Sequence, residues 1–401
     1  MNKKNSNNKY KFTFIDLFAG IGGFHIAMSE LGGKCVFGCD IDKNAAETYK
    51  QNFGMNILSD IKKINIKEIP THDVLCAGFP CQSFSNAGKK RGFSDIRGTL
   101  FFDIVKIIQI HHPKYIFLEN VKHLVRHDNG RTWNTIKQTL IDLGYILPEK
   151  EIISSPHEIG IPQNRPRIYI MGIRKDLIND KFLKINLPIC NKISSIYDIL
   201  NKEVDSKYTI TQYESEILLA WDVFKRNIHK NVFGFPIWVD EFEKNYDISS
   251  FPKWKQEYIT KNRQLYSENK NFIDEWLAKY NVKIFKKRDR KFEWQAGDSA
   301  ESVWDTSIQL RQSGIRCKKT NYFPALVAMV QIPIIGKYKR RLTPREVARL
   351  QSFPESFIIN NNDFFAYKQF GNSLNIEIVK YYAKQLLNYK LLENDKNEKR
   401  K

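Results

Sequence analysis

The stretch KFTFIDLFAGIGG, residues 11–23, joins a predicted strand to a turn and to the start of a predicted helix. Residues 11–18 are dense in β-branched and aromatic side chains, which indicates a buried strand. The glycines that follow permit a tight turn and a close approach of the backbone to a ligand. Residues 24–31 predict a helix, so the stretch opens a doubly wound α/β sheet. Because the GxGxxG fingerprint is incomplete, a purely structural glycine turn would give the same pattern.

The next part of the chain repeats this alternation. Residues 34–38 predict a second strand, and Asp40 follows it, where an acceptor for ribose hydroxyls belongs in such folds. Asp42 is predicted to cap a helix over residues 43–53 that Gly54 closes. Asp60 ends a third apolar segment. It is predicted either to reach an adenine ring or to serve only as a loop or cap residue.

A cysteine follows the next predicted strand. Residues 73–77 form a short apolar run, and the following GFPCQSFS, residues 78–85, places Cys81 just beyond it. Open α/β sheets bind their ligands at the carboxyl ends of their strands. Residues 85–98 are polar and rich in Gly, Lys and Arg, which suits either a loop over an anionic polymer or a solvated run of charge. A thiol beside such a loop suggests covalent chemistry on that polymer.

A carboxyl group and two arginines extend this candidate site. Residues 114–118 predict a fifth strand with Glu119 at its end, so Cys81 and Glu119 should emerge from adjacent strand ends. Arg165 and Arg167 precede a strand over residues 168–172, and their spacing directs both to one side of an extended segment. That arrangement suits a bidentate hold on a carbonyl oxygen or a phosphate. Solvated surface positions would explain isolated residues of these types equally well.

The length and composition of the chain limit the kinds of protein that it can be. A chain of 401 residues favours two domains, and 64 Lys and Arg against 44 Asp and Glu give a net charge of +20. That balance favours a polyanionic partner, with an ordinary basic protein as the alternative. Six cysteines without CxxC pairs indicate reduced thiols rather than disulfides or a zinc site. No apolar run approaches the ~18 residues of a membrane span, and the first residues lack a signal peptide, so we expect a cytoplasmic protein without a membrane partner.

Taken together, the motifs resemble those of the DNA (cytosine-5) methyltransferases, in the usual order of that family. They are DLFAGIGGF (16–24), GFPCQSFS (78–85), ENV (119–121), QNRPR (163–167), RLTPREVARLQSFP (341–354) and QFGNSL (369–374). The resemblance implies an α/β fold: a Rossmann-like S-adenosylmethionine-dependent methyltransferase domain with a second, smaller target recognition domain. We expect the catalytic domain over residues 1–189, target recognition over 190–339, and a hinge with a C-terminal return over 340–401.

The resemblance also implies a mechanism. Cys81 would add to C6 of cytosine, and Glu119 would bond to N3 and the exocyclic amine. Arg165 would hold the base carbonyl, with Arg167 supporting the site. The residues expected around S-adenosylmethionine are Phe18, Gly20, Gly22, Gly23, Asp40, Ile41, Asp60, Ile61, Pro80, Leu100, Asn372 and Ser373. This set requires residues 371–373 to fold back beside the first glycine turn.

Double-stranded DNA is the expected partner, and its target base must be flipped out of the stack. The loop residues expected to contact DNA are Gln82, Ser85, Asn86, Lys89, Arg91 and Arg97. Residues 190–339 hold six of the seven tryptophans, expected mostly in the core, with helices over 214–226 and 271–280 and irregular structure elsewhere. Within this segment Arg311, Gln312 and Arg316 are expected to read base edges.

The implied function is DNA cytosine-5 methylation by a monomeric modification enzyme that is paired with a restriction endonuclease. Two alternatives remain at this point: a tRNA cytosine-5 methyltransferase, and a DNA-binding relative that has lost catalysis. The long basic segment counts against the first alternative. The joint presence of Cys81, Glu119, Arg165 and Arg167 counts against the second.

Overall fold

A computed structural model describes residues 10–80, 100–190, 194–228, 234–326 and 331–392. The chain divides into two compact units. Unit 1 comprises residues 1–192 and 348–401, and unit 2 comprises residues 193–347. The domain boundaries expected from the sequence, after residues 189 and 339, lie a few residues before the observed ones.

Unit 1 is built on a seven-stranded sheet in the order β2-β1-β3-β4-β8-β5, with β6 paired to β8. Its strands are β1 (Phe12–Leu17), β2 (Gly33–Cys39), β3 (Val74–Ala77), β4 (Tyr115–Val121), β5 (Tyr145–Ile146), β6 (Ile152–Ser154) and β8 (Arg167–Arg174). The first four run parallel, whereas β8 is antiparallel to β4. A further short strand, β7, covers Gln163–Asn164. The expected α/β sheet is therefore present, with mixed rather than purely parallel pairing.

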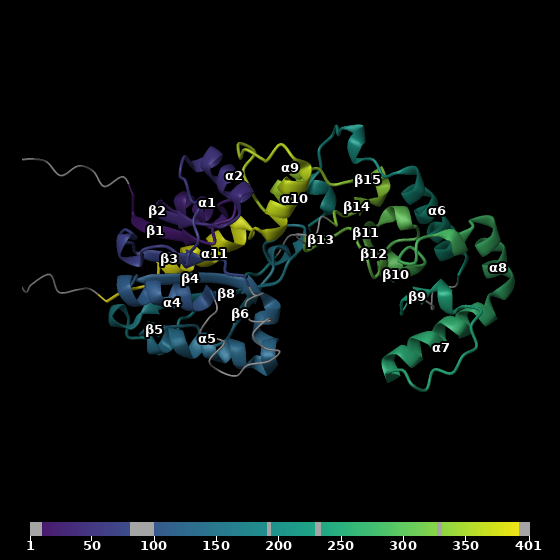
Figure 1. Cartoon of the computed structure of the whole chain (residues 1–401), viewed down its shortest axis with the longest axis horizontal. Coiled ribbons are helices and arrows are strands. Elements are labelled where there is room, and N and C mark those ends of the chain that lie inside the picture. Colours follow the sequence, from purple (N-terminus) through teal and green to yellow (C-terminus); the bar gives the residue numbers. More distant parts are fainter. Residues whose placement is uncertain (1–9, 81–99, 191–193, 229–233, 327–330, 393–401) are drawn as a thin grey trace, which may run out of the picture. The chain divides into compact units, whose positions relative to one another are not determined.

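Helices cover both faces of this sheet (Figure 1). They are α1 (Gly23–Glu30), α2 (Lys43–Phe53), α4 (Leu100–His111), α5 (Arg131–Asp142), α10 (Asp363–Asn372) and α11 (Ile376–Leu387), while α9 (Pro344–Leu350) crosses the division between units. Alternate side chains of β1 point to opposite faces of the sheet. Those of Ile15 and Leu17 pack in a hydrophobic core with residues of α4 and α5. On the other face, α1 and α11 pack together and against β4 and β8. Both faces are thus buried, as a doubly wound sheet requires.

Local sequence rules set several of these elements. Asp42 caps α2 as predicted, its carboxylate accepting from the backbone N–H groups of Asn44 and Ala45, and Gly54 ends that helix with a left-handed φ of 71°. One expectation was wrong in detail. Glu119 does not follow its strand but lies within it, because β4 pairs with β8 as far as Val121.

The late glycine segment returns to the first one. A Cβ atom added at Gly23 would lie 2.7 Å from Cδ1 of Leu374 and 3.2 Å from Oγ of Ser373. The predicted return of residues 371–373 to the first motif is confirmed, and a side chain at position 23 would have to displace Leu374.

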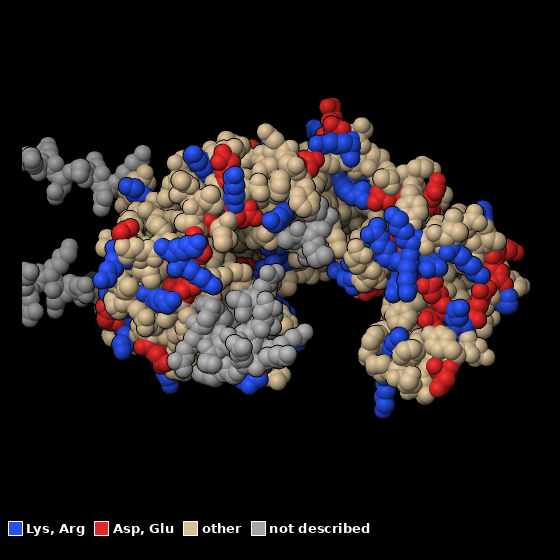
Figure 2. All heavy atoms as spheres, viewed as in Figure 1, with Lys and Arg blue, Asp and Glu red and all other residues tan. Residues whose placement is uncertain are grey.

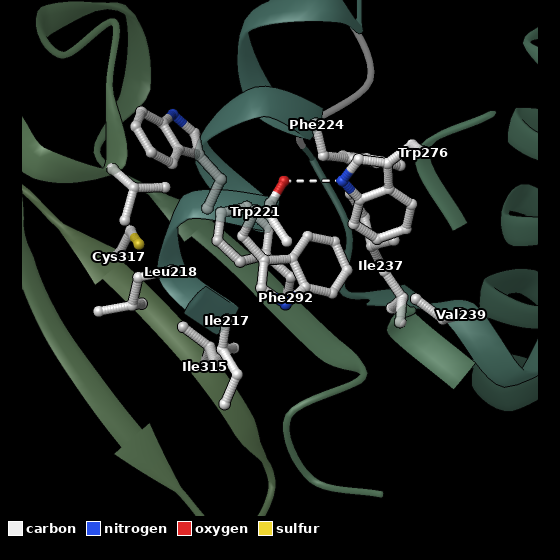
Figure 3. Close-up of a cluster of buried hydrophobic side chains, with 14 of the residues drawn as sticks. Ile217, Leu218, Trp221, Phe224, Ile237, Val239, Trp276, Phe292, Ile315 and Cys317 are labelled. Carbon is white, nitrogen blue, oxygen red and sulfur yellow. Dashed lines mark hydrogen bonds between the residues drawn. The ribbon is translucent and has the colours of Figure 1, made fainter. Parts of the chain in front are cut away.

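Unit 2 contains helices α6 (Gln212–Asn227), α7 (Lys253–Glu268) and α8 (Lys270–Lys279) and a six-stranded sheet in the order β15-β14-β11-β12-β10-β9. The strands are β9 (Ile237–Trp238), β10 (Lys291–Gln295), β11 (Ser307–Arg311), β12 (Gly314–Lys318), β14 (Ile334–Ile335) and β15 (Arg340–Arg341), and β13 covers Phe323–Pro324. The apolar face of this sheet packs on α6 and α8, where Trp221 stacks on Phe292 with ring centroids 4.7 Å apart (Figure 3). Trp276 donates its indole N–H to the backbone carbonyl of Ala220 at 2.7 Å.

The sequence located only part of this unit. The helices predicted over residues 214–226 and 271–280 are confirmed as α6 and α8. The expectation of irregular structure elsewhere was wrong, since it missed α7 and the sheet. The tryptophans divide as buried (Trp221, Trp276, Trp294), half-buried (Trp238, Trp304) and exposed (Trp254). None of the helices among the described residues is long and apolar enough to cross a membrane.

Asp222 on α6 links this helix to residues 302 and 303 of unit 2 by buried hydrogen bonds. Its side chain is buried, and its Oδ1 accepts from the Ser302 hydroxyl at 2.6 Å and from the backbone N–H of Val303 at 2.7 Å. Asp222→Ala would leave two buried donors unpaired, so we expect a loss of about 2–4 kcal/mol in the free energy of unfolding. Chemical denaturation of the full chain measures this loss. Asp298→Ala, at an exposed position, is the control and should stay within about 0.5 kcal/mol of the parent; equal losses for both would remove the special role of Asp222.

Candidate active site

The carboxyl ends of β1, β2 and β3 surround a cavity of about 330 Å³ in unit 1. Its lining residues are Phe18, Cys39, Asp40, Ile41, Ser59, Asp60, Ile61, Lys62, Pro80 and Leu100. This edge of the sheet is where open α/β folds bind ligands. Seven residues expected around the methyl donor line one cavity, although they come from five separate stretches of the chain.

The turn after β1 is held by Asp40. One oxygen of its carboxylate accepts from the backbone N–H of Gly20 at 2.7 Å, and the other accepts from that of Asp42 at 2.8 Å. Burial raises the pKa of Asp40, and these two backbone donors act in the opposite direction. Phe18 adopts a φ of 55°, which is uncommon for a residue with a side chain and is found at ligand-binding turns. The Asp40 carboxylate therefore fixes the turn after β1.

The rest of the cavity combines apolar walls with a second carboxylate. Asp60 caps its own turn, accepting from the backbone N–H of Lys62 at 3.0 Å, and it also lines the cavity. The expected role as a cap residue is confirmed, and the contact with an adenine ring stays a prediction. Ile41 is 75% exposed, which leaves apolar surface available for a ligand to cover. The lining does not include Gly20, Gly22 or Gly23, nor Asn372 or Ser373.

Glu119 on β4 and Arg167 on β8 form an ion pair, with Arg167 Nε 2.9 Å from Glu119 Oε1. Their side chains are only 13% and 15% exposed, so the interaction is poorly screened by water. Neighbouring strand β3 leads into Gly78, where an added Cβ would lie 3.8 Å from Glu119 Oε2. The stretch that precedes Cys81 thus runs beside the Glu119 carboxylate.

Asn120 ties these two strand ends together. Its side-chain amide donates to the backbone carbonyl of Phe79 at 2.8 Å and accepts from the N–H of Val121. Both Asn120 and Phe79 are buried. Sequence reasoning noted Asn120 only as a neighbour of Glu119; its place in the ENV motif was the available signal for this positioning role.

Arg165 is buried and joins the site to the late motif. Its Nη2 donates to the carbonyls of Gly371 at 2.9 Å and Ser373 at 2.6 Å. Burial, with repulsion from Arg167, lowers the pKa of Arg165 to about 9, so the guanidinium stays charged at neutral pH. This link between residues 165 and 371–373 was not foreseen, because nothing in the sequence connects positions 206 residues apart.

The proposed nucleophile and its loop lie outside the described residues, which stop at Pro80 and resume at Leu100. This applies to Cys81, Gln82, Ser85, Asn86, Lys89, Arg91 and Arg97. Their roles remain predictions from sequence.

The expected base-reading residues lie on the β11–β12 hairpin of unit 2. Arg311 ends β11, Gln312 is exposed in the turn, and Arg316 lies within β12. Both arginines bind the carboxylate of Glu293 on β10, a partner that the sequence analysis missed. The sequence around a charged residue on a half-exposed strand does not indicate which strands pair with it.

Comparison with known proteins gives one family over nearly the whole chain. The family described as C-5 cytosine-specific DNA methylase matches residues 12–388. The Type II methyltransferase M.HpaII of Haemophilus parainfluenzae is 38% identical over 390 residues, covering 96% of this chain and 92% of that protein. The Type II methyltransferase M.HhaI of Haemophilus parahaemolyticus is 32% identical over 381 residues, covering 94% and 95%.

Solved structures show a similar fold at lower identity. The methyltransferase EhMeth of Entamoeba histolytica has a TM-score of 0.57 at 19% identity, covering 94% of this chain and 97% of that one. The S. pombe Dnmt2 methyltransferase has a TM-score of 0.53 at 20% identity, covering 94% and 98%. The fold, the order of the motifs and the full-length relatives agree: this chain belongs to the C-5 cytosine-specific DNA methylase family.

Proposed function

We propose that the protein transfers a methyl group to C5 of a flipped cytosine in a specific duplex DNA sequence, through a covalent bond between Cys81 and C6. The observation that carries the proposal is the pairing of strand ends in unit 1. β3 leads through Gly78–Pro80 toward Cys81, directly beside β4 and its Glu119–Arg167 pair. A DNA cytosine-5 methyltransferase is also what family membership indicates.

The cavity at the edge of β1 to β3 is the proposed binding site for S-adenosylmethionine. Phe18, Ile61 and Leu100 offer apolar contact for an adenine ring, and Asp40 and Asp60 offer acceptors for ribose hydroxyls and the adenine amine. When bound, it supplies an electrophilic methyl group on sulfur. Gly20, Gly22 and Gly23, with Asn372 and Ser373, are proposed to complete the site around the rest of the molecule.

Cys81 is proposed to attack C6 as the thiolate, which makes C5 nucleophilic enough to accept the methyl group. Glu119 would bond to N3 and the exocyclic amine and offset the charge that develops there. Arg167 holds the Glu119 carboxylate in place. A base such as water then takes the C5 proton. The electron pair of that C–H bond restores the C5–C6 double bond, and the bond between C6 and sulfur breaks to release Cys81 as the thiolate.

Arg165 is proposed to contact the base carbonyl and also to act as a positioning residue. Its two hydrogen bonds to residues 371 and 373 fix the late motif on the glycine turn after β1. The loop residues Gln82, Ser85, Asn86, Lys89, Arg91 and Arg97 are proposed to hold the opened duplex. Unit 2 is proposed to recognise the target, in a monomeric enzyme paired with a restriction endonuclease.

Labelled-methyl transfer to duplex DNA and to tRNA tests this function. Transfer to DNA alone is expected, and bisulfite sequencing of DNA from cells expressing the protein should show one methylated sequence. Transfer to tRNA alone would make the protein a tRNA cytosine-5 methyltransferase. Sequence-specific binding without any transfer would make it a DNA-binding relative without catalysis.

Asp40 is expected to matter for methyl-donor binding. In Asp40→Ala the carboxylate that binds Gly20 and Asp42 is lost, as are the acceptors offered to the ribose. Hydrogen bonds to charged groups contribute about 1.5–3 kcal/mol, so we expect the Kd for S-adenosylmethionine to rise about 10- to 150-fold. Isothermal titration calorimetry measures this. Glu47→Gln, exposed on α2, is the matched control; an unchanged Kd in Asp40→Ala would place the ribose elsewhere.

A further inference from the structure

One face of the unit 2 sheet is polar and basic. In β10, β11 and β12 alternate residues point into the core, including Phe292, Ile308 and Ile315. The residues between them point to the opposite face: Lys291, Glu293 and Gln295 on β10, Gln309 and Arg311 on β11, and Arg316 and Lys318 on β12. In Figure 2 Lys and Arg side chains gather over this part of unit 2. Strand alternation therefore builds a surface with four cationic side chains and one carboxylate.

Glu293 lies at the centre of this face. It is opposite Arg316 in the parallel β10–β12 pair, and Arg316 is opposite Gln309 in the β11–β12 hairpin. Arg316 donates through Nε at 2.8 Å and through Nη2 at 3.0 Å, which occupies one side of its guanidinium. Among the described residues, Arg311 donates through Nη2, at 2.6 Å from Glu293 Oε2. The two guanidinium groups are thus held by one carboxylate.

The charges do not balance within the cluster. Burial, and then the charge of Arg316, lowers the pKa of Arg311 and of Lys318. Burial alone would raise the pKa of Glu293, but its bonds to the two arginines outweigh burial and lower it. Four cationic side chains, Lys291, Arg311, Arg316 and Lys318, share this face with the single carboxylate of Glu293. The face therefore retains net positive charge for an anionic partner.

The strand geometry suits a DNA groove. β11 pairs with β14 only through Ser307 and Ile308, so residues 309–311 form an edge of the described sheet next to the hairpin turn. The major groove of B-DNA admits a two-stranded β-ribbon, and an arginine fork matches O6 and N7 of guanine. A guanidinium that is already held by a carboxylate loses less side-chain entropy when it makes that contact.

We propose that Glu293 is a positioning residue for sequence recognition, which holds Arg311 and Arg316 in the orientation that reads guanine in the target duplex. This inference rests on the proposed function. As a negative charge facing DNA, Glu293 also weakens attraction to phosphates of any sequence. Its removal should therefore lower discrimination and leave non-specific binding equal or tighter. A residue that only held the sheet together would not produce this combination.

The test uses the full chain with S-adenosylmethionine and a pool of duplexes randomised around a central cytosine. Bisulfite sequencing of the pool gives the base preference at each position. We expect Glu293→Gln to reduce the preference for guanine at one position by about 5- to 150-fold, the range of one bidentate base contact. Arg311→Lys should reduce the preference at the same position. Arg316→Lys keeps the charge but loses the bidentate guanidinium, so it should reduce the guanine preference by a smaller factor. It serves as the second variant if Glu293→Gln does not fold.

Three further measurements complete the experiment. Glu275→Gln, exposed on α8, is the matched control and should keep the parent profile. Binding of a non-target duplex to Glu293→Gln should be equal or tighter, and its thermal midpoint should match that of the control. An unchanged base profile, or a uniform loss of activity with a lowered thermal midpoint, would overturn the positioning role. If the parent protein methylates no duplex in the pool, the proposed function itself fails, whatever Glu293 does.

Discussion

Cys81→Ala should reduce methyl transfer by about 10⁴-fold or more while specific DNA binding remains. Without an attacking thiolate C5 of cytosine stays a poor nucleophile, and loss of the nucleophile in other covalent enzymes costs effects of this size. Binding should persist because the arginines and lysines proposed to contact DNA are unchanged. Single-turnover transfer of labelled methyl groups measures the first effect, and fluorescence anisotropy with the target duplex measures the second.

A substituted base separates the covalent step from transfer. The parent should form a denaturation-resistant complex with duplex DNA that carries 5-fluorocytosine at the target, because fluorine at C5 cannot leave as a proton. Cys81→Ala should form none. Cys190→Ala is the matched control, since Cys190 is an exposed cysteine in unit 1 and lies away from the candidate site in sequence. Methyl transfer by Cys81→Ala at the parent rate would end the covalent mechanism.

Much of unit 1 could be predicted because local sequence rules decide its elements. The strand before Phe18, the helix between Asp42 and Gly54, and the strand ending at Ala77 each carry strong signals of pattern and capping. Once these elements alternate along the chain, the doubly wound order brings Asp40 and Asp60 to one edge without further information. The cavity there follows from topology.

The contacts within the site could not be predicted in the same way. Asn120 bonding to Phe79, and Arg165 to the carbonyls of residues 371 and 373, join positions far apart in the chain. Residue types alone do not specify such pairs. The extension of β4 through Glu119 was missed because the pairing with β8 overrides the polar character of that segment.

Most of the sequence of unit 2 lacks the periodic and capping patterns that predict the secondary structure of unit 1. The strands described in unit 2 span two to five residues each, so any periodic signal is short. Charged residues occupy alternate positions of β10 and β12, so the composition of these strands resembles that of a basic loop. The structure shows the sheet, because Phe292 of β10 and Ile315 of β12 pack in the same hydrophobic core. Sequence therefore pointed to Arg311 and Arg316 but not to Glu293, which holds both.

Glu119→Gln tests the second group of the proposed chemistry. Glutamine keeps an oxygen for Arg167 and a similar volume, but it cannot carry the charge or exchange a proton with the base. Positioned proton donors and acceptors contribute about 10²- to 10⁴-fold, so we expect single-turnover methyl transfer to fall within that range. The Kd for the target duplex should change little, because the side chain acts on the flipped base.

The ion pair with Arg167 makes a double-mutant cycle informative. Arg167→Gln leaves the Glu119 carboxylate without the guanidinium 2.9 Å away, in a site where both side chains are largely buried. Because each residue depends on the other, the double variant should lose much less activity than the product of the two single losses. Glu158→Gln, also in unit 1 and bonded to Ser154, controls for the loss of a carboxylate. Fully multiplicative losses would show that Glu119 and Arg167 act independently. A loss below about tenfold in Glu119→Gln would remove Glu119 from the chemical step.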